Sequence, residues 1–209
     1  PRIMRKKASS ESRSTAYACR ALPEGYDLYK RIDLTKDRNS LVAINIWNLA
    51  AALAMILPML FVHPIEYAFY METGKVIFCF AASIVGMVVY VFLHEGIHGI
   101  FIRLFTRTSA SFGLDIKHGM AHASSSWYFR KWPYIIIALS PVAIWGAVLG
   151  LLLRDVQETY FWYLYIIQIF NVMGAAGDLY VTCAVCRMPK NILIFDNGTA
   201  MDFYREIKS

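Results

Sequence analysis

A short segment, His94-Glu95-Gly96-Ile97-His98, holds the residue types from which a catalytic metal site can be built. On a helix, His94 and His98 share one face, so both imidazoles can bind a single metal ion. Glu95 lies about 100° round the helix from His94, where it can take a proton from metal-bound water without being a ligand. The pattern favours zinc, whose catalytic sites use three protein ligands and keep one position for water. The alternative is a pair of core histidines bonded to neighbouring helices.

Such a site needs a third ligand, and Asp178 is the best candidate. It is the only acidic residue between Tyr160 and Cys186, in an otherwise apolar segment where a carboxylate needs a partner. The small residues 174–177 directly before it would let two helices approach closely. An aspartate that only accepts hydrogen bonds from Tyr or Ser hydroxyls remains the alternative.

Asn171 precedes Asp178 by seven residues, about two helical turns, and so shares its face on a continuous helix. Its amide could position a substrate or donate a hydrogen bond to an oxyanion. A role in joining neighbouring helices is at least as well supported.

His118 and His122 are rival metal ligands. The alternation of apolar and small or polar residues over 112–116 predicts a strand, with a turn at His118-Gly119 and a returning strand over 120–124. On a hairpin the two histidines are not one helical turn apart, so a shared metal ion is disfavoured. We expect them to lie at the surface or contact substrate, with one of them joining the zinc as the less favoured alternative.

The elements that position these residues are predicted to cross a membrane. Hydrophobic residues make up 57% of the chain and charged residues 17%, whereas soluble domains have about 45–50% and about 25%. A spanning helix needs about 20 apolar residues. Four stretches meet this requirement, at 41–62, 76–105, 134–153 and 160–186, the third with a kink at Pro141. We therefore predict a mainly α, polytopic membrane protein of four helices with a small cytoplasmic β-hairpin.

The connections between the spans alternate in charge. The segments 1–40, 103–133 and 187–209 are rich in Lys and Arg, whereas 63–75 and 154–159 are net acidic. By the positive-inside rule, both termini lie in the cytoplasm. His94 and Asp178 each lie eighteen residues into a span that runs inward (94 − 76 and 178 − 160), at about 27 Å along the helix. Their equal depth supports a shared metal.

The domain organisation follows from these spans. We predict a basic cytoplasmic tail over 1–40, a membrane-embedded core over 41–186 with the hairpin loop at 107–131, and a cytoplasmic tail over 187–209. The polar start resembles no secretory signal. The net charge of +6 is concentrated before Leu41, without the aromatic interleaving of a nucleic-acid groove, so we expect a lipid bilayer as partner and no nucleic acid. The four cysteines form no disulfide pattern.

The chain resembles the putative zincin peptidase family of bacterial membranes, which is distantly similar to the site-2-type intramembrane metalloproteases. The resemblance rests on Leu93 to Gly99, the 112–116 strand, Leu139-Ser140-Pro141 and Ala176-Gly177-Asp178-Leu179. It implies two histidine ligands, Glu95 as the base and Asp178 as the third ligand. Leu179 departs from the site-2 pattern, where Gly follows the aspartate and Asn stands just before it.

These observations lead to one functional expectation. We expect a membrane metalloprotease of the bacterial cell membrane in which Glu95 assists attack of a zinc-bound water on a peptide bond of a membrane-associated protein or peptide. The exposed edge of strand 112–116 would hold the unwound substrate segment. A metal-binding scaffold or immunity-type factor that cleaves nothing is the alternative, and an ion or proton pathway ranks last.

Overall fold

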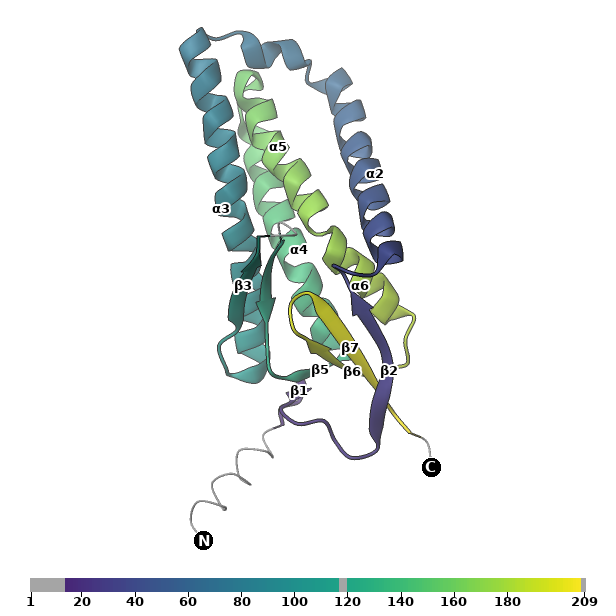
Figure 1. Cartoon of the computed structure of the whole chain (residues 1–209). Helices are drawn as coiled ribbons and strands as arrows, with labels where there is room; N and C mark the ends of the chain where they lie inside the picture. The colour runs from purple at the N-terminus through teal and green to yellow at the C-terminus, as the bar shows by residue number, and fades with distance from the viewer. Residues whose placement is uncertain (1–13, 117–119, 208–209) are drawn as a thin grey trace.

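Four long helical segments dominate the computed structural model, which describes residues 14–116 and 120–207 (Figure 1). The segments that are long and apolar enough to cross a membrane are α2 (Arg38–Val62), α3 (Thr73–Thr106), α4 (Lys131–Asp155), and α5 (Glu158–Gly174) followed directly by α6 (Ala176–Cys186). All four predicted spans are therefore confirmed as helices. Each begins slightly earlier in the chain than predicted, and a short 3-10 helix, η1 (Ile65–Phe69), joins α2 to α3.

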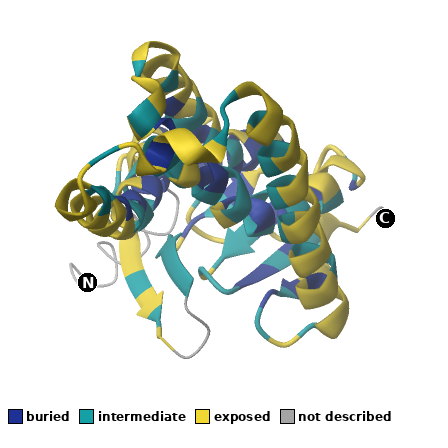
Figure 2. Cartoon of the chain, turned by 90° about the horizontal axis from the view of Figure 1, so that it is seen from above, coloured by how far each residue is buried: buried dark blue, intermediate teal, exposed yellow. Residues whose placement is uncertain are grey.

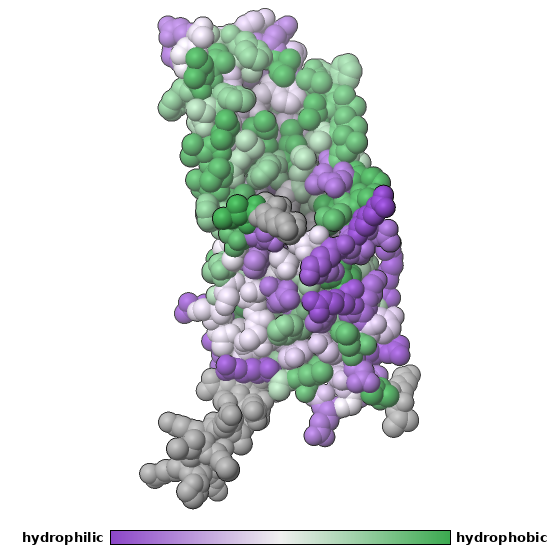
Figure 3. All heavy atoms as spheres, in the orientation of Figure 1, coloured by the Kyte–Doolittle hydropathy of each residue, from purple (hydrophilic) through white to green (hydrophobic). Residues whose placement is uncertain are grey.

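The outer faces of these helices are apolar and exposed. Figure 3 shows a green hydrophobic zone over the helical half of the molecule, with polar residues above and below it. Viewed from above, buried residues lie on the inner sides of the helices and exposed residues on the outer sides (Figure 2). Phe61 and Phe92 are 88% and 68% exposed, so the helices pack only along their inner faces. An exposed apolar surface of this size marks contact with another apolar phase or partner.

The fourth segment is interrupted at Ala175. Its N–H bonds back to Asn171 O at 3.3 Å, and a new helix starts when Leu179 N–H bonds to Ala175 O at 2.9 Å. In Figure 1 the chain bends between α5 and α6 at this point. The interruption sets the direction of α6 independently of α5, and Asp178 lies in the first turn of α6.

The segments predicted as terminal tails contain strands of one sheet, which our reading of the sequence did not predict. The sheet has the order β1 (Ala18–Cys19), β5 (Tyr128–Arg130), β6 (Leu193–Asp196), β7 (Ala200–Glu206) and β2 (Tyr26–Asp33), with every pair antiparallel. It packs beneath the ends of α3, α4 and α6 around a common core. The core includes Ile102, Phe129, Val181, Val185, Ile194 and Phe203.

The predicted hairpin is confirmed as β3 (Ser111–Asp115) and β4 (Met120–Ser124), a separate two-stranded sheet with Phe112 opposite Ala123 and Gly113 opposite His122. The hairpin lies along the final turns of α3 (Figure 1). It fits closely there because Gly99 has no side chain. A Cβ at this position would come within 2.5 Å of the Phe112 ring.

Candidate metal centre

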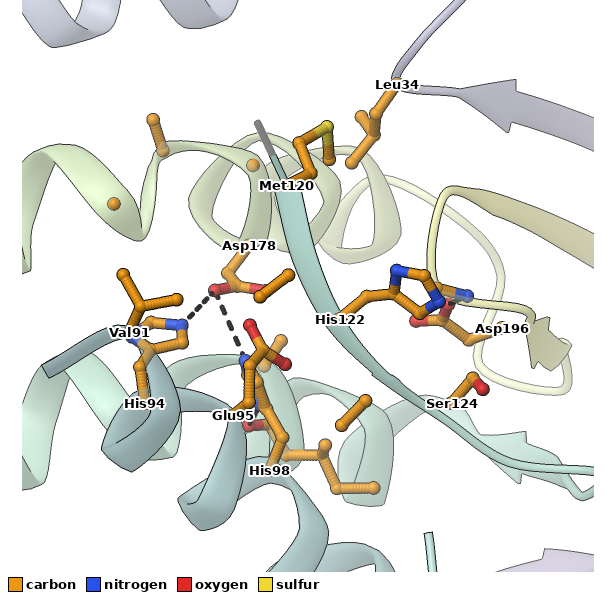
Figure 4. Close-up of a pocket in the computed structure, with 18 of the residues that line it drawn as sticks. Leu34, Val91, His94, Glu95, His98, Met120, His122, Ser124, Asp178 and Asp196 are labelled. Atoms are coloured by element: carbon orange, nitrogen blue, oxygen red, sulfur yellow. Dashed lines mark hydrogen bonds and ion pairs between the residues drawn. The ribbon is translucent and has the colours of Figure 1, made fainter. Parts of the chain in front are cut away.

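Helix α3 places His94 and His98 next to each other, and both rings are almost fully buried. The first turn of α6 brings Asp178 to the same point. One oxygen, Asp178 Oδ2, lies 3.2 Å from His94 Nε2 and 3.5 Å from His98 Nε2 (Figure 4). Three side chains from two helices that are far apart in sequence therefore direct one atom each at a common point.

The spacing of these atoms fits a zinc ion. Zinc binds His nitrogen and carboxylate oxygen at about 2.0–2.2 Å in a tetrahedral arrangement, in which ligand atoms are separated by about 3.4 Å. The two N–O distances of 3.2 and 3.5 Å bracket this value. His94, His98 and Asp178 are also the ligand types that zinc prefers, so the residues present suit the metal.

Hydrogen bonds fix the orientation of the His98 ring. Its Nδ1 lies 2.9 Å from the carbonyl oxygen of Ile137 in α4. A carbonyl only accepts, so Nδ1 carries a proton, and Nε2 is the nitrogen that would bind a metal held between the ring and Asp178. This arrangement is the one in which a histidine binds a metal.

The His94 ring is held by a longer chain of partners. Its Nδ1 lies 2.7 Å from the Tyr90 hydroxyl, which itself donates to Asn171 Oδ1 at 2.7 Å. The hydroxyl therefore accepts from His94 Nδ1–H, and Nε2, which contacts Asp178 Oδ2, is the nitrogen that would bind a metal. Asn171 Nδ2 in turn donates to Val142 O and Gln168 Oε1, both at 3.4 Å, which fixes the amide orientation.

Asn171 thus lies behind the histidine rather than beside a substrate. Its side chain is fully buried, and it is not among the residues that line the cavity at the metal centre. Of the two roles that the sequence left open, the geometry therefore favours joining helices behind His94 over a contact with substrate or an oxyanion. Tyr90, which sequence reasoning missed, is the residue that connects Asn171 to the centre. Its position one turn before His94 on the same helical face was the available signal.

Glu95 lies at the centre without pairing with Asp178. Its carboxylate and the ring nitrogens of His94 and His98 offer ligand atoms within 4.8 Å of one another. The backbone N–H of Ala123 in β4 faces the carboxylate. Oxygen Oε2 is buried and has no partner among the described residues. This oxygen is therefore available to a bound molecule.

The rival histidines differ in what the structure shows of them. His118 lies outside the described residues. His122 extends from the opposite side of β4, away from Glu95 and next to Asp196 (Figure 4). Its ring is enclosed by two glycines, since a Cβ on Gly113 or Gly198 would collide with it. The position gives no support to His122 as a ligand at this centre.

The metal centre forms one wall of a cavity of about 480 Å³. Helix α2 contributes the facing wall through Leu41, Ile44 and Asn48, and β4 contributes residues 120–124. The hairpin strand beside the cavity is therefore β4, and not the 112–116 strand that was predicted to present its edge there. Strand β3 lies on the outer side of the hairpin, where Phe112 and Leu114 are exposed.

Asp196 lines the far end of the cavity, at the end of β6 next to the turn that leads to β7. Its Oδ2 accepts from the Tyr134 hydroxyl and its Oδ1 from the Gly198 N–H, each at 2.7 Å. Burial raises the pKa of this carboxyl above its ordinary value, while the Tyr134 hydrogen bond opposes the shift. The bond ties the sheet to α4.

Comparison with protein families identifies the chain. The sequence model of a family described as putative zincin peptidase matches residues 87–193, about half of the chain. The chain belongs to this family. The zincin-peptidase region contains His94, Glu95, His98 and Asp178 together with the β3–β4 hairpin, whereas α2, β2 and β7 lie outside it.

Among curated proteins, the chain is similar to an uncharacterized 24.7 kDa protein in gap 5'region of Pyrococcus woesei. The two are 31% identical over 120 residues, which cover 55% of this zincin-family chain and 51% of the relative. The chain thus spans about half the length of the curated relative it matches. No solved structure shows significant similarity to it.

Proposed function

We propose that this zincin-family protein is a membrane-embedded, zinc-dependent peptidase that hydrolyses a peptide bond at or near the membrane. One observation carries the proposal. A single oxygen of Asp178 meets the Nε2 atoms of His94 and His98, next to a Glu95 oxygen without a partner. Membership of the putative zincin peptidase family supports the same reaction class.

The helix lengths support a site at the inner boundary of the bilayer. Helix α3 has 34 residues and a length of about 51 Å, more than the roughly 30 Å of a hydrocarbon core. His94 follows Thr73 by 21 residues (94 − 73), or about 32 Å. With the start of α3 on the outer side, as loop charge predicts, the site lies where apolar segments meet cytoplasmic water.

His94, His98 and Asp178 would hold the metal, and the remaining chemistry belongs to Glu95. When bound, zinc supplies a Lewis acid that polarises the peptide carbonyl and makes water more acidic. Glu95 accepts the proton of the attacking water through its unpartnered Oε2, while the Ala123 N–H faces the carboxylate. Oxygen bonds to the carbonyl carbon, the C–N bond breaks, and Glu95 returns the proton to the leaving amine.

Strand β4 supplies a docking edge for an extended substrate. The Ala123 N–H faces Glu95, so the backbone groups of Ala121, two residues earlier, face the same edge. The opposite edge of β4 is paired with β3. A helix must unwind before its peptide bonds can be cut, and an added strand satisfies the backbone groups that unwinding exposes.

The variant Glu95→Gln tests this reaction. Gln keeps the size of the side chain but cannot take a proton, so the variant should retain zinc and lose hydrolysis. Glu72→Gln, at an exposed position before α3, is the matched control and should behave as the native protein. Purified proteins in liposomes are incubated with a pooled set of single-span peptides. Mass spectrometry detects new termini, and elemental analysis measures zinc.

Each of the following results would contradict the proposal or favour its alternative. Full hydrolysis by Glu95→Gln would remove the assigned base from the mechanism. Purified native protein that binds no zinc, or whose zinc content is unaffected by Asp178→Ala, would remove the metal centre. Cleavage of no peptide, with zinc bound and a cellular phenotype that survives Glu95→Gln, would favour the non-proteolytic metal-binding scaffold.

A further inference from the structure

Asn48 in α2 has a polar atom that its own fold leaves unsatisfied. Its Oδ1 is buried and forms no hydrogen bond with any described residue. The side chain lies in the middle of an apolar helix that is long enough to cross a membrane. A buried acceptor without a partner is costly, and it is costlier at membrane depth, where lipid offers no donor.

The unsatisfied oxygen belongs to the cavity of the metal centre. Leu41, Ile44 and Asn48 recur at helical spacing and form the α2 wall, while His94, Glu95 and His98 lie on the α3 wall. Asn48 is ten residues (48 − 38) from the start of α2, and His94 is twelve (106 − 94) from the end of α3. The distances along the helices are about 15 and 18 Å, so the two residues lie at similar depth.

A strand bound along β4 would require an acceptor at this place. Such a strand pairs one edge with β4 and presents a second row of N–H and C=O groups on its other edge. Figure 1 shows the hairpin beside α3 and helix α2 on the other side of the molecule. The second row therefore faces α2, which has only apolar side chains near the cavity apart from Asn48.

We infer that Asn48 is a substrate-binding residue whose Oδ1 accepts a backbone N–H from the unwound, extended segment of the peptide held over the metal centre. The inference rests on the proposed peptidase function. It adds that the α2 wall of the cavity, opposite β4, recognises the backbone of the substrate. Because a backbone N–H is common to all residues except proline, Asn48 selects for an unwound chain rather than for a side chain.

A substrate-binding role and a structural role for Asn48 predict different effects of its replacement on folding stability. An asparagine that joined helices would be destabilising to remove, whereas one with an unsatisfied oxygen can be replaced by Leu without loss of a bond. Asn48→Leu should therefore unfold at the same temperature as the native protein or at a higher one. Zinc content should not change, because Asn48 contacts none of the proposed ligands.

The test compares Asn48→Leu with Asn45→Leu, an exposed asparagine one turn earlier on α2 that does not line the cavity. For a single-span peptide cleaved in liposomes, Asn48→Leu should raise KM about threefold to tenfold with little change in kcat, as expected for loss of one neutral hydrogen bond. In the Glu95→Gln background, binding of the same fluorescein-labelled peptide should weaken by the same factor. Asn45→Leu should change neither.

Each result decides one question. An unchanged KM and an unchanged peptide Kd in Asn48→Leu overturn the inference, even when cleavage depends on Glu95 and the proposed function stands. A marked fall in unfolding temperature also overturns it, because Asn48 would then serve the fold. Peptide binding that depends on Asn48, with no Glu95-dependent cleavage by the native protein, supports the inference and removes the peptidase proposal.

Discussion

Replacing Tyr90 by Phe removes one hydroxyl group and tests whether the residues behind His94 control zinc binding. The hydroxyl lies 2.7 Å from both His94 Nδ1 and Asn171 Oδ1, so both lose a partner at once. Water cannot replace it at Asn171, because that side chain is fully buried. The phenyl ring keeps the packing of the Tyr90 side chain nearly intact.

The expected losses of zinc affinity and of folding stability follow from these contacts. Loss of the partner that orients a metal-binding histidine reduces metal affinity about 10- to 100-fold, which corresponds to about 1.4–2.8 kcal/mol. The unsatisfied Asn171 oxygen costs the fold about 1–3 kcal/mol separately. We therefore expect weaker zinc binding and a lower unfolding temperature of the metal-free protein, both from one atom.

The assay is competition for zinc between detergent-purified protein and a chromophoric chelator. Tyr163→Phe is the matched control, because the Tyr163 hydroxyl donates to Ala68 O at 2.8 Å, next to η1 and away from the centre. It should lose no zinc affinity. Native zinc affinity in Tyr90→Phe, or an equal loss in Tyr163→Phe, would refute a role of the Tyr90–Asn171 chain at the metal.

Two further predictions concern the ends of the helices and the sheet. Lys131 is buried, and its Nζ donates to Cys186 O at 2.9 Å and Met188 O at 2.6 Å. Lys131→Met should therefore lower the free energy of unfolding by about 2–3 kcal/mol. Chemical denaturation measures this loss, with Lys75→Met, at an exposed position, as the control. The raised pKa of Asp196 means that the folded state holds the carboxyl proton more tightly than the unfolded state does. The contribution of this group to the free energy of unfolding is therefore full below the unfolded pKa of about 3.9 and is lost as pH rises through the folded pKa. Asp196→Asn, which keeps an oxygen for Tyr134, should gain stability relative to the native protein across that rise in a series of thermal unfolding curves. A stability difference that is independent of pH would contradict this assignment.

The helices and the central residues could be predicted because their signals are local. Runs of apolar residues define spans by length alone, and the spacing of His94 and His98 places both on one helical face. Asp178 was predicted from the cost of an isolated carboxylate in an apolar helix, together with its depth. These arguments need only the residues within single segments, the direction of each span and a bilayer of fixed thickness.

The sheet could not be predicted because its strands come from three distant parts of the chain. Strand β2 is mostly exposed and charged, and its pairing with β7 is a tertiary contact that no local pattern encodes. One signal was available. Asn197-Gly198 lies between the apolar residues 192–195 and 200–201 and forms the turn between β6 and β7, with Gly198 at φ +100°.

Asn171 joins neighbouring helices, which is one of the two roles that its sequence position left open, and its relation to Asp178 has a geometric reason. Its predicted position on the face of Asp178 assumed a continuous helix, and the interruption at Ala175 changes the rotation between the two residues. As a result Asn171 faces Tyr90 while Asp178 faces the histidines. The run of small residues before Asp178 allowed close approach of helices, but their pattern did not indicate an interruption.

The positions of the unsatisfied polar atoms argue for a ligand in the cavity. In the described part of the chain, six buried side-chain atoms have no hydrogen-bond partner, and three of them, Asn48 Oδ1, Glu95 Oε2 and His122 Nδ1, belong to residues that line the cavity at the metal centre. Each such atom costs about 1–3 kcal/mol that an apolar side chain of similar shape would avoid. A protein that served only as a scaffold would gain stability from such replacements. The cost is accounted for when a bound molecule with several polar groups, such as an extended peptide, satisfies these atoms together.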